Sequence, residues 1–377
     1  MADSPFEVSE PVLGFGLMRL PRVRDDRHLP IDAARVTQLV DRFIAAGGTY
    51  FDTAFIYGDG DSEHCARQAL VRRYPRESFQ LADKLPFWKA ASYDDLGTFF
   101  DLSRRRCGVT YFDVYLLHSV TQNNYEKADE VEAWRFLSEL KEQGRALRIG
   151  FSFHDRPELL DQLLTEHPEI DVVQLQLNYI DWDDPEVQAA ENYDIARKHG
   201  KQIIVMEPVK GGGLADMDED IADIFYAADP DASPASWAMR FAGNLENVAV
   251  VLSGMNSIEQ LDDNLATFAD FKPLTMDELD CIDEVKARLQ QRLTIPCTGC
   301  RYCTKDCPAA IDIPEFLNIL NEYYIYSSPS RCQHEYNMML GTSGLPKDCI
   351  GCGQCEEACP QHLEIIEYLK ELDGLCG

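Results

Sequence analysis

Residues 49–58 have the sequence TYFDTAFIYG. The apolar pair Tyr50 and Phe51 indicates a short buried strand that ends at Asp52. Tyr57 follows on the loop beyond the strand, so two acid–base side chains stand close together in the chain. Enzymes built from β–α units place such groups at the carboxyl edge of a parallel sheet. The segment therefore predicts a catalytic edge, although alone it fits equally well a core strand followed by a solvated Asp and a packed Tyr.

Seven more strands are predicted from apolar runs, at residues 11–18, 79–82, 112–117, 147–151, 172–177, 203–206 and 248–252. Helical patterns separate most of them, running from Asp32 to Gly47 and over residues 62–70, 93–106 and 128–143. Regular β–α alternation over about 270 residues predicts a parallel sheet, and eight units predict a closed (β/α)8 TIM barrel of the α/β class. A doubly wound open sheet would show G-x-G-x-x-G opening a helix, whereas Gly14-x-Gly16 lies inside a strand.

Two later strands end in ionisable residues, Lys84 and His118. In a closed barrel these side chains meet Asp52 and Tyr57 at one mouth. Lys84 is then expected to lower the pKa of Tyr57, with Asp52 holding the ammonium and a neutral His118 orienting a substrate carbonyl. The four groups together predict protonation of a carbonyl oxygen while a hydride reaches its carbon. His118 alone would be better explained as a core histidine.

The charge balance limits the classes of partner. Of 377 residues, 65 are acidic and 35 basic, which gives a formal charge of −30. Nucleic acids and anionic membrane surfaces are bound by clustered Lys and Arg, so this balance argues against both. No apolar run approaches the length of a membrane span, and residues 1–5 lack the pattern of a secretory signal. We therefore expect a cytoplasmic protein whose acidic surface serves solubility or reflects an unusual salt environment, which we favour over a specific basic partner.

The chain resembles the aldo/keto reductases. Asp52, Tyr57, Lys84 and His118 stand in the family's order within FDTAFIYG, LADKLP and VYLLHS, and IGFSFHD, VVQLQLNY and VVLSGMNSIEQLDDN also match. The likeness covers the chain from about residue 11 to 270 and implies a catalytic Asp-Tyr-Lys-His tetrad and NAD(P)H bound without a Rossmann fold. It implies Gln174 near the nicotinamide, Ser152 near its carboxamide and Asn264 at the adenine end. The full set of implied cofactor-binding positions is Gly16, Ser152, Gln174, Gly254, Gln260 and Asn264.

Four positions refine what the resemblance implies. Gly254 and Gln260 stand where relatives grip the 2′-phosphate of NADP with Lys and Arg, so the choice between NAD(H) and NADP(H) stays open. Phe153 replaces an Asn of many relatives, which leaves the anchoring of the nicotinamide open. His118 is kept, whereas relatives that reduce a conjugated C=C bond carry Glu there. This favours the interconversion of carbonyl and alcohol.

The thirteen cysteines are sparse up to Cys297 and dense after it. Residues 297–308 and 349–360 both follow C-x-x-C-x-x-C-x-x-x-C-P. This is the bacterial ferredoxin run, in which three thiolates hold one cluster and the fourth reaches the other. It predicts one [4Fe–4S] cluster on Cys297, Cys300, Cys303 and Cys359, and a second on Cys349, Cys352, Cys355 and Cys307. A zinc site would leave the third and fourth cysteines of each run unexplained.

The gap between the two runs carries helical patterns at 313–324 and 331–340, similar to the α-helical ferredoxin modules. The whole chain thus resembles the aldo/keto reductases with a C-terminal ferredoxin-type 4Fe-4S domain. We expect the barrel at 1–274, a linker helix at 275–293 and a mostly α-helical ferredoxin-like 2[4Fe-4S] domain at 294–377. The remaining cysteines are expected to be structural or incidental thiols: Cys65, Cys107, Cys281, Cys332 and Cys376.

The leading hypothesis is an NAD(P)H-linked oxidoreductase that acts on a small carbonyl or alcohol. Its clusters would serve one-electron transfer to or from a redox partner protein or second cofactor. A hydride carries two electrons and a cubane takes one, so a direct link needs a converter such as a flavin. The sequence has no flavin signature, although a barrel mouth can bind a phosphate-bearing cofactor. One alternative is an electron-transfer or nicotinamide-sensing module without turnover, which the complete tetrad argues against. Another is that the clusters are purely structural and stabilise a small C-terminal domain that cannot bury enough apolar surface by itself.

Overall fold

The computed structural model describes residues 6, 10–25, 30–185, 187–291, 295–297, 299–326 and 328–376. They form two compact units, one from Met1–Pro208 and Ala238–Leu274 and the other from Val209–Trp237 and Thr275–Gly377. Residues 1–5, where the sequence predicts no secretory signal, lie outside the described part of the chain. So do residues 292–293 at the end of the predicted linker.

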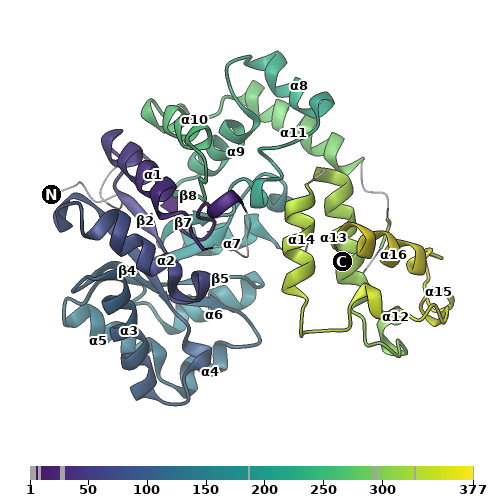
Figure 1. The fold of residues 1–377 in the computed structure, drawn as a ribbon, viewed down its shortest axis with the longest axis horizontal. Coiled ribbons are helices and arrows are strands. Elements are labelled where there is room, and N and C mark those ends of the chain that lie inside the picture. The colour runs from purple at the N-terminus through teal and green to yellow at the C-terminus, as the bar shows by residue number, and fades with distance from the viewer. Residues whose placement is uncertain are drawn as a thin grey trace. The chain divides into compact units, whose positions relative to one another are not determined.

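The first unit contains eight parallel strands that close into a barrel in chain order (Figure 1). Closure is made by β1, which pairs with both β2 and β8. The predicted TIM barrel is therefore confirmed, and each predicted strand overlaps an observed one. The strands are β1 (Val12–Gly16), β2 (Tyr50–Asp52), β3 (Gln80–Leu85), β4 (Phe112–Val120), β5 (Ala146–Phe153), β6 (Val172–Gln176), β7 (Gln202–Met206) and β8 (Val248–Ser253).

Alternate residues of the strands fill the interior of the barrel, as the two-residue period of a strand requires. One buried core there contains Tyr50, Ala82, Val114, Leu116, Val172, Ile204, Ala249, Val250 and Leu252. Gly14 makes room for these side chains, since a Cβ on it would lie 2.6 Å from Val250 Cγ1 and 2.7 Å from Leu252 Cδ2. The barrel is therefore a packed core and not a pore.

The helices of the first unit that connect its strands pack outside the barrel (Figure 1). The first begins as the sequence predicts, because the Asp32 carboxylate accepts hydrogen bonds from the backbone of Ala34 and Arg35. The helices up to the end of the barrel sequence are α1 (Ala33–Ala45), α2 (Asp61–Ala66, continued by a π-helical turn at Arg67–Val71), α3 (Tyr93–Cys107), α4 (Tyr125–Glu130), α5 (Ala133–Glu142), α6 (Pro157–Glu166), α7 (Ala189–Lys198), α8 (Glu219–Ala228), α9 (Pro234–Gly243) and α10 (Ile258–Ala269).

The predicted single helix at 128–143 is wrong in its continuity. α4 ends at Glu130, and Glu132 adopts a φ of 56° before α5 begins. A left-handed non-glycine residue costs backbone energy, but here it starts a new helix with its own buried face around Trp134 and Leu137. The apolar spacing continues across the break, so the sequence pattern does not reveal it.

The second unit is mostly helical and has its own apolar core around Phe316, Leu320 and Leu372. Helices α13 and α14 lie side by side, and α16 packs against both (Figure 1). Asn321 ties the chain that enters this unit, because its side-chain amide both accepts from and donates to the backbone of Ile295, at 3.0 and 2.9 Å. The helices are α11 (Met276–Gln290), α12 (Tyr302–Lys305), α13 (Ile313–Tyr326), α14 (Pro329–Met338), α15 (Gln354–Glu357) and α16 (Ile365–Cys376).

The segment Val209–Trp237 follows β7 in the chain but belongs to the second unit. Arg331 on α14 donates to Glu322 at 2.9 Å and to the backbone oxygen of Lys210. The Lys210 ammonium lies 3.8 Å from the other oxygen of Glu322. A charged network therefore holds the start of this segment against α13 and α14. The predicted domain boundary at residue 274 assigns the segment to the barrel and so does not describe this arrangement.

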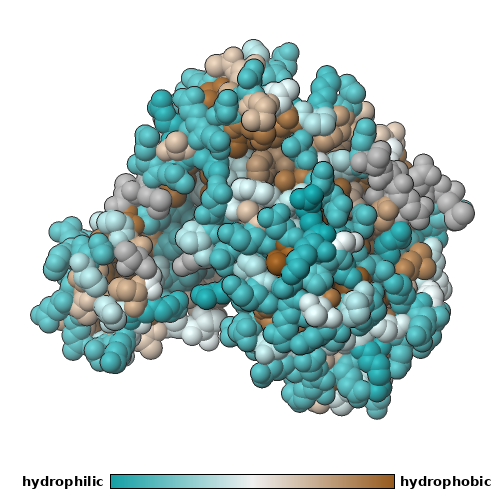
Figure 2. Space-filling view, turned by 180° about the vertical axis from the view of Figure 1, so that it is seen from behind, coloured by the Kyte–Doolittle hydropathy of each residue, from teal (hydrophilic) through white to brown (hydrophobic). Residues whose placement is uncertain are grey.

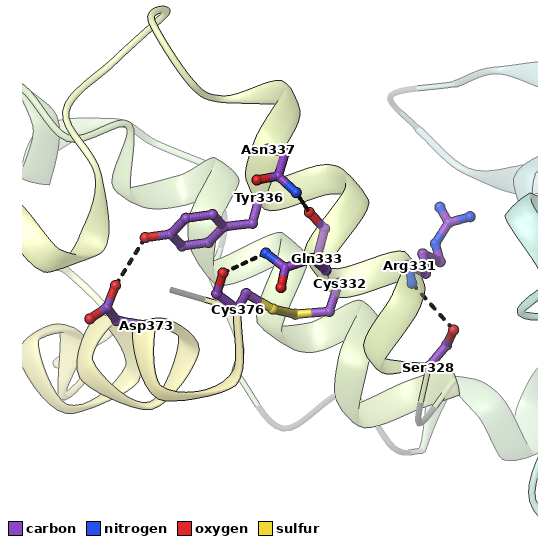
Figure 3. Close-up of a disulfide and its surroundings, with 8 residues drawn as sticks. All are labelled: Ser328, Arg331, Cys332, Gln333, Tyr336, Asn337, Asp373 and Cys376. Atoms are coloured by element: carbon purple, nitrogen blue, oxygen red, sulfur yellow. Dashed lines mark hydrogen bonds between the residues drawn. A yellow bond between two sulfur atoms is a disulfide. The ribbon is translucent and has the colours of Figure 1, made fainter. Parts of the chain in front are cut away.

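Two of the leftover cysteines are not thiols: Cys332 on α14 and Cys376 at the end of α16 form a disulfide (Figure 3). Their Cα atoms lie 6.5 Å apart, within the range that a disulfide spans. Gln333 beside it donates to the backbone oxygen of Cys376, and Tyr336 donates to Asp373 at 3.0 Å. The expectation of free thiols is corrected here, because the packing of two helices distant in sequence decides the pairing. A bridge over 44 residues contributes about 4 kcal/mol in the chain-entropy account.

The surface agrees with the acidic composition. Hydrophilic residues cover most of the face shown in Figure 2, and apolar residues form small patches between them. Among the helices of the described residues, none has the length and apolarity that a membrane crossing requires.

Candidate functional site

The strand period brings the predicted catalytic residues to one end of the barrel. Tyr50, Ala82, Leu116 and Val172 point into the interior core. The residues two positions further along these strands point the same way and stand nearer the carboxyl ends. They are Asp52, Lys84, His118 and Gln174, all of which are buried.

Lys84 is the centre of this group. Its ammonium donates to Asp52 Oδ1, to the backbone oxygen of Thr53 at 2.9 Å and to the Tyr57 hydroxyl at 3.3 Å. The other Asp52 oxygen accepts from Gln174 Nε2 at 3.1 Å. All three ammonium protons thus have acceptors, so Lys84 is fixed beside the phenol.

The two titratable partners are shifted upward in pKa. Burial raises the pKa of Tyr57 above its ordinary value of 10.0, the Lys84 ammonium lowers it and the Asp52 charge raises it. Lys84 therefore lowers the pKa of Tyr57 as the sequence predicts, but burial, which the sequence does not reveal, outweighs the ammonium and leaves the net shift upward. For Lys84, burial by itself lowers the pKa, but the charge of Asp52 and the Tyr57 hydroxyl bring the pKa above 10.5. At neutral pH the site holds a neutral phenol beside a charged ammonium.

His118 is kept neutral by its surroundings. Burial, Lys84 and His154 lower the pKa of His118 well below 6.5. Its ring lies edge-on to Tyr57, with centroids 5.6 Å apart, and 5.7 Å from the ring of Trp88. Within the described part of the chain, His118 Nδ1 has no hydrogen-bond partner. A neutral imidazole carries one N–H, so His118 can donate a hydrogen bond from the ring nitrogen that holds its proton.

Trp88 was missed by the sequence analysis. It stands on the short 3-10 turn Phe87–Lys89 just after β3 and is half-buried. The signal was available, because an aromatic residue four positions after Lys84 on a strand-end loop reaches the same mouth.

The implied cofactor-binding positions fall in two places. Gln174 and Ser152 belong to the inner mouth, where the Ser152 hydroxyl accepts from the backbone N–H of Ser119 at 2.7 Å. The other four gather where β1 meets β8 and α10. A Cβ on Gly16 would lie 3.3 Å from Ser253 O, and buried Asn264 donates to the Ser253 hydroxyl at 2.9 Å.

The remaining two positions, Gly254 and Gln260, are exposed. Gln260 accepts from the backbone N–H of Asn256 at 2.9 Å, so its amide braces the loop after β8. A cation absent from the sequence analysis lies nearby: a Cβ on Gly254 would be 3.4 Å from Arg19 Cβ, and Arg19 pairs with Glu207 at 3.3 Å.

The eight cysteines of the two runs surround two cavities in the second unit. One cavity is lined by Cys297, Cys300, Cys303 and Cys359. The other is lined by Cys307, Cys349, Cys352 and Cys355. Each cavity therefore combines three cysteines of one run with the last cysteine of the other.

The donor sets fit iron–sulfur clusters. Four thiols converge on each cavity, and most of the other lining side chains are apolar, including Leu317 and Ile365 in one and Ile311 and Leu369 in the other. An all-sulfur set in an apolar pocket is the environment that a cubane requires. Cys300 and Cys352 are the exposed members.

Known proteins with similar sequences or structures support the same division of the chain. The model of the aldo/keto reductase family matches residues 12–287, and that of the 4Fe-4S dicluster domain matches residues 296–364. The uncharacterized oxidoreductase YtbE of Bacillus subtilis is 26% identical over 265 residues, which cover 69% of this chain and 86% of that protein.

Two solved structures share the fold. The holo form of aldo-keto reductase AKR11C1 from Bacillus halodurans has a TM-score of 0.59 at 24% identity, covering 72% of this chain and 91% of that one. An aldo-keto reductase from Klebsiella pneumoniae in complex with NADPH has a TM-score of 0.59 at 20% identity, covering 74% of this chain and 91% of that one.

Proposed function

Because the chain belongs to the aldo/keto reductase family of oxidoreductases and carries a C-terminal 4Fe-4S domain, we propose that it interconverts a small carbonyl compound and an alcohol. The observation that carries this proposal is the contact of Lys84 with both Asp52 and Tyr57 beside His118. The proposed catalytic residues are Asp52, Tyr57, Lys84 and His118, at the carboxyl ends of β2, β3 and β4.

In the reducing direction Tyr57 gives its hydroxyl proton to the carbonyl oxygen. Lys84 stabilises the phenolate that remains, and Asp52 keeps the ammonium in place. His118 donates a hydrogen bond to the carbonyl oxygen as a neutral imidazole and so orients it. NADH or NADPH, when bound at the mouth, would supply the hydride. In the oxidising direction Tyr57 returns as the base, by the same contacts.

The nicotinamide end would lie near Gln174 and Ser152, and the rest of the cofactor would follow Gly16, Gly254, Gln260 and Asn264. The two cysteine sets would each hold one [4Fe–4S] cluster, in the crossed arrangement of the ferredoxin run. Such clusters supply one-electron transfer, so we propose that the second unit exchanges electrons with a redox partner protein or a second cofactor, a flavin among the candidates. The domain limits that we propose are 1–274, 275–293 and 294–377.

The pH dependence of carbonyl reduction tests the assignment of Tyr57 and His118. Reduction needs a protonated Tyr57, whose pKa lies above 10.0, and a neutral His118, whose pKa lies well below 6.5. We expect kcat to be constant across neutral pH, to fall on the acid side as His118 protonates, and to fall on the alkaline side only above pH 10. Steady-state rates from about pH 5 to about pH 11 check this. A kcat that rises steadily with pH through neutrality would contradict an acid role for Tyr57.

Nucleotide choice is predicted from Gly254 and Gln260. Neither carries a charge that would offset the desolvation of a 2′-phosphate, and the nearby Arg19 is already paired with Glu207. We expect NADH to bind at least as tightly as NADPH, because each lost charged hydrogen bond is worth about 1.5–3 kcal/mol. Fluorescence titration with both nucleotides measures the difference. A clear preference for NADPH would contradict the prediction and direct attention to Arg19, whose substitution by Met should then remove the preference.

A further inference from the structure

A buried ion pair lies behind the loop that carries Tyr57. Arg106, near the end of α3, donates to Glu63 on α2 at 2.8 Å. The Glu63 side chain is 0% exposed and that of Arg106 is 19% exposed. Within the described part of the chain, the hydrogen bonds that Lys84 makes to Asp52, Thr53 and Tyr57 involve neither Arg106 nor Glu63. The pair therefore has no direct part in the chemistry, and its position calls for another explanation.

Arg106 contacts both ends of the loop between Phe55 and Gly60. Its guanidinium carbon lies 4.6 Å from the centroid of the Phe55 ring, and the same nitrogen that binds Glu63 approaches the backbone oxygen of Phe55 at 3.4 Å. At the other end, a Cβ on Gly60 would lie 2.6 Å from the central carbon of the guanidinium. Glycine is required there both for this approach and for a φ of +95°. Tyr57 stands between the two contacts.

The loop has a backbone that needs outside support. Gly58, Asp59 and Gly60 are consecutive residues with φ of 58°, 55° and 95°. Asp59 is not a glycine, so a positive φ costs it backbone energy. Such a conformation persists only where the surrounding structure imposes it. Two backbone hydrogen bonds each close a single turn here. The Tyr57 N–H donates to the Ala54 oxygen at 3.0 Å, and the Asp59 N–H donates to the Ile56 oxygen at 3.2 Å.

The same buried cluster also braces the strand that carries Lys84. Asp83, the neighbour of Lys84 on β3, accepts from the backbone N–H of Lys84 at 2.7 Å and from the Cys107 thiol at 3.8 Å. The side-chain ligand atoms of Asp83, Cys107 and Glu63 lie within 4.8 Å of one another. The loop of Tyr57 and the strand of Lys84 therefore rest on one set of contacts.

We propose that Arg106, held by Glu63, is a positioning residue that sets the distance between Tyr57 and Lys84. The proposal rests on the function proposed above, in which Tyr57 is the proton donor. The guanidinium fills the space between Phe55 and Gly60, and the Glu63 carboxylate keeps the guanidinium oriented. Loss of the guanidinium lets the loop relax, which carries the phenol away from the ammonium.

Arg106→Met is the main test, with carbonyl reduction and nucleotide binding measured on the full chain. We expect kcat to fall by up to about 100-fold, the cost of a misplacement near 1 Å, while the NADH Kd is unchanged. Because Lys84 lowers the pKa of Tyr57, a more distant Tyr57 should also move the alkaline limb of the pH profile to higher pH. Arg106→Lys keeps the charge opposite Glu63 but not the planar contact with Phe55, so its kcat should lie between those of the wild type and the Met variant.

Arg76→Met is the matched control. Like Arg106, Arg76 forms an ion pair and lies over an aromatic ring: it pairs with Asp113, and its guanidinium carbon lies 5.0 Å from the centroid of the Phe79 ring. The side chains of Arg76 and Asp113 are 21% and 14% exposed. Unlike Arg106, Arg76 lies at the amino ends of β3 and β4, away from the catalytic end. It should lower the thermal stability without moving kcat or the alkaline limb. If Arg106→Met behaves like this control, the proposal is overturned.

Two further results keep the outcome clear. Should Arg106→Met not fold, Gly60→Ala presses a methyl group on the guanidinium and strains the loop from its other side. It should give the same fall in kcat and the same shift of the alkaline limb, and a wild-type profile would overturn the proposal. Tyr57→Phe distinguishes a failure of the proposed function from a failure of the role proposed for Arg106. If Tyr57→Phe turns over normally, the proposed function fails, whatever the Arg106 variants do.

Discussion

Tyr57→Phe is expected to lower the turnover of carbonyl substrates by about 10²–10⁴, the usual contribution of a positioned acid. The substitution removes the hydroxyl that lies 3.3 Å from the Lys84 ammonium and keeps the ring that packs against His118. Binding of the nucleotide should be nearly unchanged, because the phenol proton acts on the carbonyl oxygen. Single-turnover rates with NADH and a series of simple aldehydes measure the effect independently of product release.

Lys84→Met serves as the companion variant. It removes the charge that stabilises the phenolate, so the rate should fall in the same range, while the phenol remains. Asp52 then loses its cation in a buried site, and the folding of this variant has to be checked by circular dichroism. Wild-type turnover in Tyr57→Phe would exclude the proposed acid–base mechanism for this chain.

Cys307→Ala is expected to damage the cluster proposed for the second run, although Cys307 belongs to the first run by sequence. Cys307 lines the same cavity as Cys349, Cys352 and Cys355. Removal of one of four thiolates leaves a cubane with an open iron, which weakens its retention. Iron analysis and electron paramagnetic resonance on anaerobically purified protein should show loss of about half of the iron, from one of two cluster signals.

The matched control for this prediction is Cys303→Ala, which lies in the same run but lines the other cavity. Cys303→Ala should weaken the signal of the cluster proposed for Cys297, Cys300, Cys303 and Cys359. The signal that Cys307→Ala removes should remain. If the two variants damage the same cluster, the ligand sets follow the sequence runs and the crossed arrangement is wrong.

The barrel and the meeting of its strand ends were predictable because both follow from local periodicity. Asp52, Lys84 and His118 each end an apolar run. When a parallel sheet closes into a barrel, the carboxyl ends of its strands meet at one end of the barrel, so the three side chains lie together there. The cysteine runs were equally informative, since their spacing matches a defined donor set. In both cases a short sequence pattern carries the geometry.

Other features depend on packing that no local pattern contains. The net pKa shift of Tyr57 results from the balance of burial against Lys84, and burial is a property of the folded barrel. The break at Glu132 lies within a continuous apolar pattern. The pairing of Cys332 with Cys376 requires α14 and α16 to be adjacent, which the spacing of 44 residues does not suggest.

The Cys332–Cys376 bridge has a consequence for how the protein must be made. Ten of its cysteines lie after residue 296, and eight of them are the proposed cluster ligands. In a chain that has not yet folded or received iron, those eight cysteines can exchange with the bridge, because thiol–disulfide exchange needs only an accessible thiolate and an accessible disulfide. Cluster assembly calls for reductant and the bridge for oxidant, so the two maturation steps compete in one tail. The order that preserves both is metallocluster insertion first, which sequesters the eight sulfurs, and oxidation of the last pair afterwards.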